Sequence, residues 1–338
     1  AFAVMAGGTD SSGRVYTNEL SYLSFEAIRR TGLTYPTVGL CWTRGIPDSL
    51  SMLVADLIAD GYATPAFFAD DVIVKGMKHY GVPDLEAHDY INSTCVEITP
   101  RASSNVWVAS PYFNLCGILL ELIDGTHEIK DFESFADAYF ALLSCKIEAA
   151  VLEQNRMREE RRLYGRKPLQ SIFTLSCRER GKDIDNGGAK YNWVESSFVG
   201  LANLVDSLAA IREAVFKERA LSLQELKKLL DSDFSSSESL RQKLKRYPKY
   251  GNADSSVDSL ITFVTAKIKT ECARWKMLPD DAHFIPGMFC WIQHQLLGAK
   301  TGATPDGRSA GFAFADGAGP AQGRELNGPT SGIRSVTS

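Results

Sequence analysis

Apolar side chains recur every third or fourth position along much of the chain, which is the spacing of amphipathic helices. This periodicity predicts helices over residues 17–31, 49–60, 71–80, 113–123, 133–163, 193–217, 222–231 and 256–277. The apolar runs at 1–6 and 66–68 are too short for helices, and we interpret them as buried strands. Helices that alternate with short apolar strands indicate an α/β fold, whether its sheet is open or closed.

Two polar segments interrupt this pattern. Residues 231–238 are rich in serine and predict a surface loop. Residues 298–338 are rich in Gly, Pro, Asp and Thr and have little periodicity. In a compact enzyme such a stretch is usually a packed functional loop rather than a linker.

Composition excludes several classes of protein. The net charge is −4, from 37 basic and 41 acidic residues, which gives no reason to expect binding to nucleic acid or to an anionic membrane. No apolar run approaches the roughly 20 residues that span a bilayer. The seven cysteines are irregularly spaced, which predicts free thiols in a reducing compartment, the cytoplasm. The five histidines show no metal-ligand spacing, so we expect no metal.

The tripeptide Cys95-Val96-Glu97 is the sharpest candidate for chemistry. Polar and apolar residues alternate from Thr94 to Ile98, which is consistent with an extended segment. Residues two apart in an extended chain point to the same side, so a thiol and a carboxylate would share one cavity. A cysteine can act there as a nucleophile, a metal ligand or a radical carrier, and a glutamate as an acid or base. Taken alone, however, the tripeptide is more often a buried thiol beside an exposed carboxylate.

Several other blocks occur in a characteristic order around this tripeptide. They are Gly7–Asp10, Thr17–Tyr22, Arg180–Asn192, Asp206–Ile211, Pro248–Asn252, Gly302–Arg308, Gln322–Arg324 and Asn327–Thr330. Together with Cys95-Val96-Glu97 they resemble the glycyl radical enzymes, the pyruvate formate-lyase-like superfamily, over nearly the whole chain.

The resemblance implies a fold and a mechanism. The fold is part of a ten-stranded barrel, two antiparallel halves of parallel strands surrounded by helices. Residues 1–338 are then one barrel-domain fragment that lacks an N-terminal part and the glycyl radical domain. The resemblance makes Cys95 the residue whose thiyl radical abstracts hydrogen from a small polar substrate, and Glu97 the proton carrier. It implies a glycyl radical installed by an iron–sulfur, S-adenosylmethionine-dependent activase, a homodimer when full length, and a cytoplasmic or microcompartment location.

The chain departs from the family pattern at four places. The Arg-Val-x-Gly-Tyr motif that carries the radical does not occur in these 338 residues, and the chain opens on Ala rather than Met, so we expect a fragment that is inactive alone. Thr94 replaces the first of the two adjacent cysteines of pyruvate formate-lyase itself. Ala109 falls where diol and choline lyases carry an aspartate. Cys41 and Ala69 replace a frequent arginine and asparagine, which suggests an unusual substrate.

These features rank the possible functions. Elimination, with cleavage of a C–O, C–N or C–S bond, comes first, and decarboxylation or another C–C cleavage is the alternative. A third hypothesis, from another class, is a non-catalytic subunit that needs a separate radical-domain partner.

Three further patterns give weaker signals. The loop Gly317–Gly323 fails the spacing of a dinucleotide-binding loop, and Pro320 would interrupt the helix that must follow. Cys290 and His294 are placed by the pattern on one helical turn, where core packing is the more common role. Cys116, Cys145 and Cys272 fall in apolar helical settings and are interpreted as small buried hydrophobes.

Overall fold

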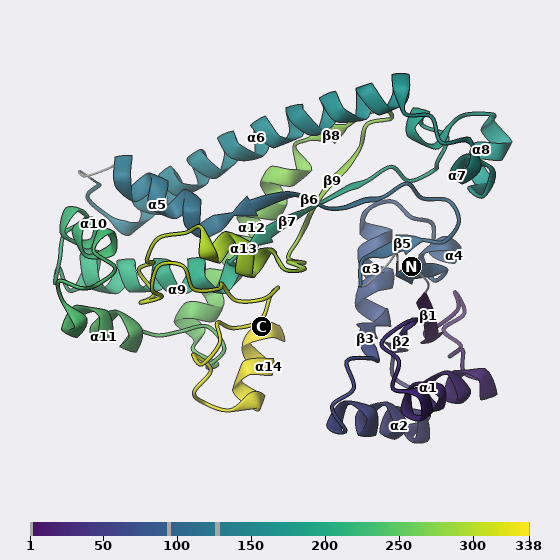
Figure 1. The fold of residues 1–338 in the computed structure, drawn as a ribbon, viewed down its shortest axis with the longest axis horizontal. Coiled ribbons are helices and arrows are strands. Elements are labelled where there is room, and N and C mark those ends of the chain that lie inside the picture. Colours follow the sequence, from purple (N-terminus) through teal and green to yellow (C-terminus); the bar gives the residue numbers. More distant parts are fainter. Residues whose placement is uncertain (1–2, 93–95, 126–128, 338) are drawn as a thin grey trace. The chain divides into compact units, whose positions relative to one another are not determined.

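The computed structural model describes residues 3–92, 96–125 and 129–337. The described residues form two compact units, each made from two separate stretches of the chain (Figure 1). The first unit comprises Ala1–Val106 and Arg166–Asn192, and the second comprises Trp107–Gly165 and Trp193–Ser338.

The first unit begins with a parallel three-stranded sheet in the order β1-β2-β3. Its elements are β1 (Ala3–Gly7), α1 (Glu19–Thr31), β2 (Thr37–Trp42), α2 (Asp48–Ala59), β3 (Ala66–Ala69) and α3 (Asp70–His79). Val38 and Leu40 lie two apart on β2 and therefore on one face of the sheet. Both pack in one apolar cluster with Phe25 of α1 and Leu50 of α2, so the two helices cover that face.

Local signals explain where α1 begins and ends. Asn18 caps its first turn, because the Asn18 side chain accepts from the Ser21 backbone N–H and the Ser21 hydroxyl accepts from the Asn18 N–H. Gly32 ends the helix with a φ of 65°, a left-handed conformation that glycine adopts without steric cost.

The rest of the first unit is a small hairpin and a returning helical segment. The elements are α4 (Asp84–Ala87), β4 (Tyr90–Asn92), β5 (Ile98–Pro100), α7 (Pro168–Ile172), α8 (Leu175–Arg180) and a 3₁₀ turn (Ile184–Asn186). Strands β4 and β5 pair antiparallel, with Asn92 opposite Ile98.

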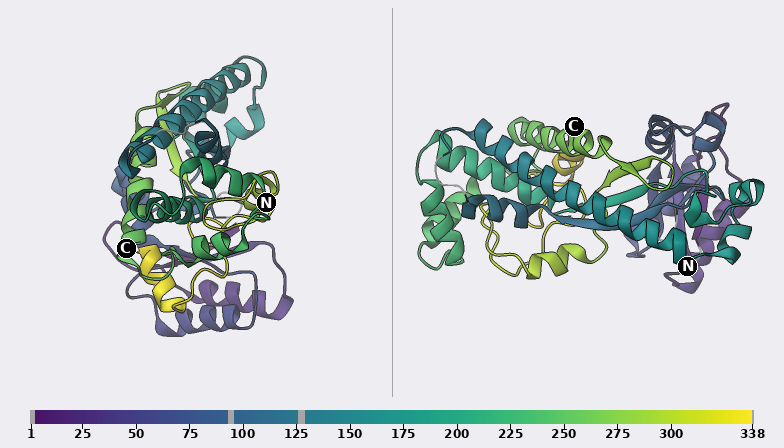
Figure 2. Two further views of the ribbon diagram at one scale, coloured as in Figure 1. Left: turned by 90° about the vertical axis from the view of Figure 1, so that its left-hand side faces the viewer. Right: turned by 90° about the horizontal axis from the view of Figure 1, so that it is seen from above.

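The second unit contains a four-stranded sheet in the order β6-β7-β9-β8, with β6, β7 and β9 parallel. Its strands are β6 (Trp107–Asn114), β7 (Val194–Val199), β8 (Lys276–Met277) and β9 (Ala282–Gly287). Its helices are α5 (Leu115–Gly125), α6 (Phe132–Tyr164), α9 (Leu201–Ile211), α10 (Leu223–Asp231), α11 (Glu238–Arg246), α12 (Ser255–Ala273), α13 (Gln293–Ala299) and α14 (Pro329–Thr337), with a π-helical turn (Arg212–Lys217) after α9. Figure 2 shows the length of α6, which has 33 residues.

Helix α9 is the centre of the second unit. All of its 11 residues are buried, which is typical of a helix surrounded by other elements. Phe113 of β6 stacks on Phe198 of β7 with ring centroids 4.7 Å apart, and both belong to the same core as Leu204 and Leu208 of α9. The core of this unit therefore forms between the parallel strands and the helices that follow them.

Most of the predicted helices are confirmed, and three predictions are corrected. The predicted helix 193–217 is a strand, β7, followed by α9, because a short buried parallel strand is as apolar as a helix. Cys290 precedes α13 and does not share its helical turn with His294. Cys145 is exposed on α6, whereas Cys116 and Cys272 are buried as predicted. Within the described ranges, none of the helices has the length and apolar character of a membrane span.

The core of the second unit supports a stability prediction. Leu119 of α5 is fully buried, and Leu152 of α6 is 62% exposed. We expect Leu119→Ala to lower the free energy of unfolding by about 3–5 kcal/mol, through lost burial and a residual cavity. Leu152→Ala, the matched control, changes it by no more than about 0.5 kcal/mol. Urea unfolding followed by circular dichroism measures both values, and similar losses for the two variants would contradict this packing.

Candidate active site

The β4–β5 hairpin carries the sequence-predicted catalytic pair. Asn92 at the end of β4 is opposite Ile98 at the start of β5, and the pair Cys95 and Glu97 lies between these two residues in the sequence. Cys95 lies outside the described residues. Glu97 is described, is half-buried and directly precedes β5. The expectation that the thiol and the carboxylate share one face therefore stays a prediction.

The hairpin is joined to the first strand of the unit. The Asn92 backbone N–H donates to Met5 Sδ at 2.9 Å, and Asn92 is 2% exposed. Strand β4 therefore lies against β1, and its last residue, Asn92, is buried and hydrogen-bonded.

A buried carboxylate organises the carboxyl ends of the parallel strands. Asp70, directly after β3, is 1% exposed. Its Oδ2 accepts from the Thr9 hydroxyl at 2.5 Å, and its Oδ1 accepts from the Tyr90 hydroxyl at 2.8 Å. Gly8 makes room for it, because a Cβ there would lie 3.0 Å from Asp70 Oδ1 and the Gly8 φ is +83°. Asp70 thus ties the ends of β1 and β3 to β4.

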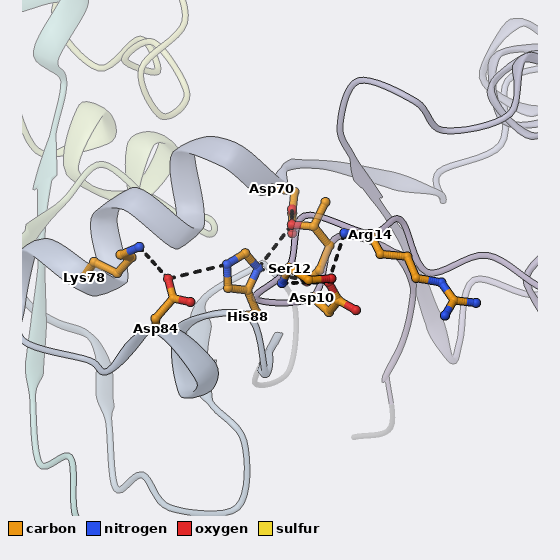
Figure 3. Close-up of polar contacts among 8 residues, drawn as sticks. Asp10, Ser12, Arg14, Asp70, Lys78, Asp84 and His88 are labelled. Atoms are coloured by element: carbon orange, nitrogen blue, oxygen red, sulfur yellow. Dashed lines mark hydrogen bonds and ion pairs between the residues drawn. The ribbon is translucent and has the colours of Figure 1, made fainter.

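The network extends outward through a histidine (Figure 3). His88 Nδ1 lies 2.9 Å from the Thr9 carbonyl oxygen, which can only accept, so this nitrogen carries a proton and donates. His88 Nε2 lies 3.8 Å from Asp84 Oδ1, and Lys78 Nζ donates to the same oxygen at 2.5 Å. A chain of polar contacts therefore runs from Lys78 on the surface to Thr9 beside the buried Asp70.

Asp10 builds a separate turn next to this network (Figure 3). Its Oδ1 accepts from the backbone N–H groups of Ser12 and Arg14, each at 2.9 Å, and from the Ser12 hydroxyl at 2.6 Å. The hydrogen bonds from Ser12 lower the pKa of the exposed Asp10 carboxyl. The Gly7–Asp10 block therefore supplies a turn through Asp10 and a partner for Asp70 through Thr9.

Cys41 and Ala69, the two substituted family positions, lie at this same edge of the sheet. Cys41 pairs with Gly7 and Phe68, and Ala69 is the last residue of β3, directly before Asp70. Cys41 is 4% exposed, and burial raises the pKa of its thiol to about 11, an effect that a hydrogen bond with Tyr90 partly offsets. Burial likewise raises the pKa of the Tyr90 hydroxyl, as do the neighbouring Cys41 and Asp70.

The block Arg180–Asn192 has a structural role within the first unit. Cys177, Ile184 and Ala189 form a small apolar cluster, and Arg180 Nη1 donates to the Ala189 carbonyl at 3.2 Å. The Tyr191 hydroxyl donates to Glu86 of α4 at 2.7 Å. These contacts attach the returning segment to the part of the unit that leads into β4.

The block Gly302–Arg308 belongs to the second unit and makes a buried polar cluster with α9. Asn203 Nδ2 donates to Asp306 Oδ2 at 2.8 Å. Asp206 accepts from the Tyr250 backbone N–H at 2.8 Å and lies near Lys249. Burial raises the pKa of Asp206 and lowers that of Lys249.

Cys290 and His294 contact their own loops. Cys290 Sγ accepts from the Gly317 N–H at 3.4 Å, and His294 Nδ1 lies 3.7 Å from Asp316 Oδ1. Over the described parts of the chain, no three His, Cys, Asp or Glu side chains converge as metal ligands.

The sequence did not reveal the polar network around Asp70. Thr9 belongs to one of the blocks that carry the resemblance, but it is 61 residues from Asp70 and 79 from His88, and Asp70 is 20 residues from Tyr90. The available signal was the Asp70-Asp71 pair directly after a strand, since polar residues at the carboxyl ends of parallel strands commonly form sites.

The Tyr90–Asp70 bond yields a testable prediction. Tyr90→Phe removes one of the two hydroxyl groups, of Thr9 and Tyr90, that donate to the buried Asp70 carboxylate, so the free energy of unfolding should fall by about 1.5–3 kcal/mol. Tyr16→Phe is the control, because Tyr16 is 59% exposed. Denaturant unfolding of the three proteins tests this, and an unchanged midpoint for Tyr90→Phe would show that the bond does not contribute.

Cys41 should react slowly with alkylating agents. With a pKa of about 11, only about one Cys41 thiol in a thousand is ionised at pH 8, and the thiolate is the nucleophile. We expect iodoacetamide to label Cys41 at least about a hundredfold more slowly in the folded chain than in urea. Peptide mass spectrometry after short pulses measures this. The exposed Cys145 is the internal reference, and equal labelling of the two cysteines in the folded chain would contradict the burial of Cys41.

Comparison with known proteins agrees with the sequence resemblance. Residues 1–298 match the family model described as pyruvate formate lyase-like. The probable dehydratase YbiW of Escherichia coli (strain K12) is 30% identical over 94% of this chain and 43% of its own length. The isethionate sulfite-lyase of Bilophila wadsworthia (strain 3_1_6) is 27% identical over 97% of this chain and 42% of its own. The chain thus spans less than half the length of these relatives.

Comparison with solved structures also supports this family. The glycerol-bound B12-independent glycerol dehydratase from Clostridium butyricum superposes with a TM-score of 0.95 and 31% identity, over 99% of this chain and 44% of that one. The expected fold class, an α/β protein that is part of the glycyl radical enzyme barrel, is therefore confirmed. The chain belongs to the pyruvate formate lyase-like family of glycyl radical enzymes.

Proposed function

We propose that the protein, when full length, is a glycyl radical lyase that eliminates a leaving group from a small polar substrate. The observation that carries this proposal is Cys95-Val96-Glu97 in a chain of which residues 1–298 match the family. Three similar proteins are a probable dehydratase, a sulfite-lyase and a glycerol dehydratase, and all three names describe cleavage of a C–O or C–S bond. We further propose that both units belong to one barrel domain.

In this proposal Cys95 transfers hydrogen atoms and Glu97 transfers protons. The glycyl radical, installed by an iron–sulfur, S-adenosylmethionine-dependent activase, would supply the unpaired electron. Cys95, as a thiyl radical, takes a hydrogen atom from a substrate C–H bond and becomes a thiol. Glu97 gives a proton to the departing group, or takes one from the neighbouring hydroxyl, while the bond to the leaving group breaks. The Cys95 thiol then returns a hydrogen atom to the product radical, which regenerates the thiyl.

The structure of the first unit supports this division. Cys95 and Glu97 lie in the sequence between the paired strands β4 and β5, and β4 is tied to buried groups through Tyr90 and Asn92. A reacting loop on a hydrogen-bonded hairpin is held more precisely than a loop between free ends. The half-burial of Glu97 fits a group that exchanges protons with a bound substrate.

The changed positions Cys41 and Ala69 bear on substrate choice. Both lie at the end of the sheet that also holds Asp70. We propose that a substrate without the charge complementary to an arginine occupies this end. The homodimer and the cytoplasmic or microcompartment location stay predictions.

Substitution of Cys95 tests the proposal in the full-length gene product after anaerobic activation. Cys95→Ala should still form the glycyl doublet in electron paramagnetic resonance, but the doublet should persist when substrate is added and no product should form. The control is Cys145→Ala on α6, which should behave as wild type, because Cys145 is exposed in the second unit. Product formation by Cys95→Ala, or a missing doublet in a folded wild-type protein, would contradict the proposal, and the latter favours the non-catalytic subunit.

Glu97→Gln separates proton transfer from radical transfer. It should keep the doublet and lower kcat by about 10²–10⁴, the usual contribution of a general acid or base. Product analysis then distinguishes the reaction types: an aldehyde or imine indicates elimination, whereas CO2 indicates the decarboxylase alternative. An unchanged kcat would remove Glu97 from the mechanism.

A further inference from the structure

A cavity in the second unit has four basic side chains in its lining. It has a volume of about 370 Å³, and its charged lining residues are Arg241 and Lys245 of α11, Arg308, Arg324 and a single carboxylate, Asp306. Small-molecule sites in proteins have volumes of about 300–1,000 Å³. The cavity is therefore large enough for a small ligand, and its charge is positive.

Two of these charges are already satisfied within the protein. Arg308 donates to the carbonyl oxygens of Phe312 at 2.6 Å and Gly302 at 2.5 Å, and to the Thr304 hydroxyl at 3.2 Å. Asp306 accepts from the Thr304 hydroxyl, the Arg308 backbone N–H and Asn203. Arg308 and Asp306 hold the loop in its conformation, and their opposite charges partly offset each other in the lining of the cavity.

The three remaining cations are less fully paired within the described residues. Neither Lys245 nor Arg324 has a side-chain hydrogen bond or ion pair within the described part of the chain. Arg241 Nη1 has a contact of 3.5 Å to the exposed Glu238, which is long for a hydrogen bond. Burial lowers the pKa of Lys245, and the neighbouring Arg241 and Arg324 lower it further. Glu238 and Asp306 raise it by a smaller amount, so several like charges are held together here with fewer carboxylates than cations.

The protein holds these cations in place by specific contacts. Arg241 Nε donates to the Gly307 carbonyl at 3.2 Å, and the Arg241 guanidinium carbon lies 5.4 Å from the centre of the Phe234 ring. Gly307 has a φ of +90°, and a Cβ there would lie 2.6 Å from Lys245 Cγ. The loop therefore needs glycine at 307, both for its backbone and to let the Lys245 stem pass.

We propose that this cavity binds a phosphate group, free or carried by a small organic molecule. Phosphate carries nearly two negative charges at neutral pH, so it offsets the repulsion among three cations better than a carboxylate does. Arginine forks match phosphate oxygens in geometry. Phe312 and Phe314 give one wall of the cavity an apolar surface that suits the organic part of a phosphate ester. This site is in the second unit and does not depend on the function proposed for Cys95.

Calorimetric titration of the chain at constant ionic strength tests this site, with inorganic phosphate and glycerol 3-phosphate as the two probes. We expect saturable binding of at least one probe, and the tighter probe identifies the free or the esterified form. Lys245→Gln and Arg324→Gln should each weaken binding by about tenfold or more, which corresponds to one charge-assisted hydrogen bond. Lys245→Arg should retain binding.

Arg246→Gln is the matched control. Arg246 is an exposed cation on the same helix and does not line the cavity, so its loss should change the dissociation constant by less than about twofold. Thermal unfolding verifies that each variant is folded, and Arg324→Gln provides the test if Lys245→Gln is not. Absence of saturable binding for both probes, or equal weakening by Arg246→Gln, would overturn the proposal without affecting the roles of Cys95 and Glu97.

Discussion

The buried carboxylate of Asp70 is the interaction on which the first unit depends. It accepts hydroxyl hydrogen bonds from Thr9, after β1, and from Tyr90, in β4, while Asp70 itself follows β3. A carboxylate that is 1% exposed is costly unless its oxygens are paired, so these three segments are held together by the same requirement. Strand β4 is one of the three and directly precedes the segment of Cys95 and Glu97 in the sequence, which links the stability of the unit to the candidate site.

The reactivity of the described cysteine thiols in the two units depends on how deeply they are buried. Cys41 lies beside Tyr90 and Asp70 and has a raised pKa, as do the buried Cys116 and Cys272 in the second unit. Burial keeps these thiols protonated and unreactive as nucleophiles. The proposed role of Cys95 differs in kind, because a thiyl radical forms by hydrogen-atom transfer and does not require a thiolate.

In the second unit, buried charges are stabilised mainly by neighbouring charges of the opposite sign. Buried cations lie close to buried anions beside α9: Asp206 is near Lys249, and Asp306 is in the same loop as Arg308. These groups balance one another inside the core. The adjacent cavity is lined by four cations and one carboxylate, Asp306, and this excess of positive charge distinguishes it from the structural polar cluster beside it.

The sequence by itself determined the family, the helices with clear apolar periodicity and the candidate pair Cys95 and Glu97. These signals are local, because a helix is predicted from the spacing of apolar residues within it, and a motif is identified from its own few residues. Strand β7 was missed because a buried parallel strand shows no alternation. Only the tertiary structure brought Asp70, Thr9 and Tyr90 together, and only it left Lys245 and Arg324 facing a cavity. Such groupings depend on strand order and crossover connections, which the spacing of residues along one chain does not encode.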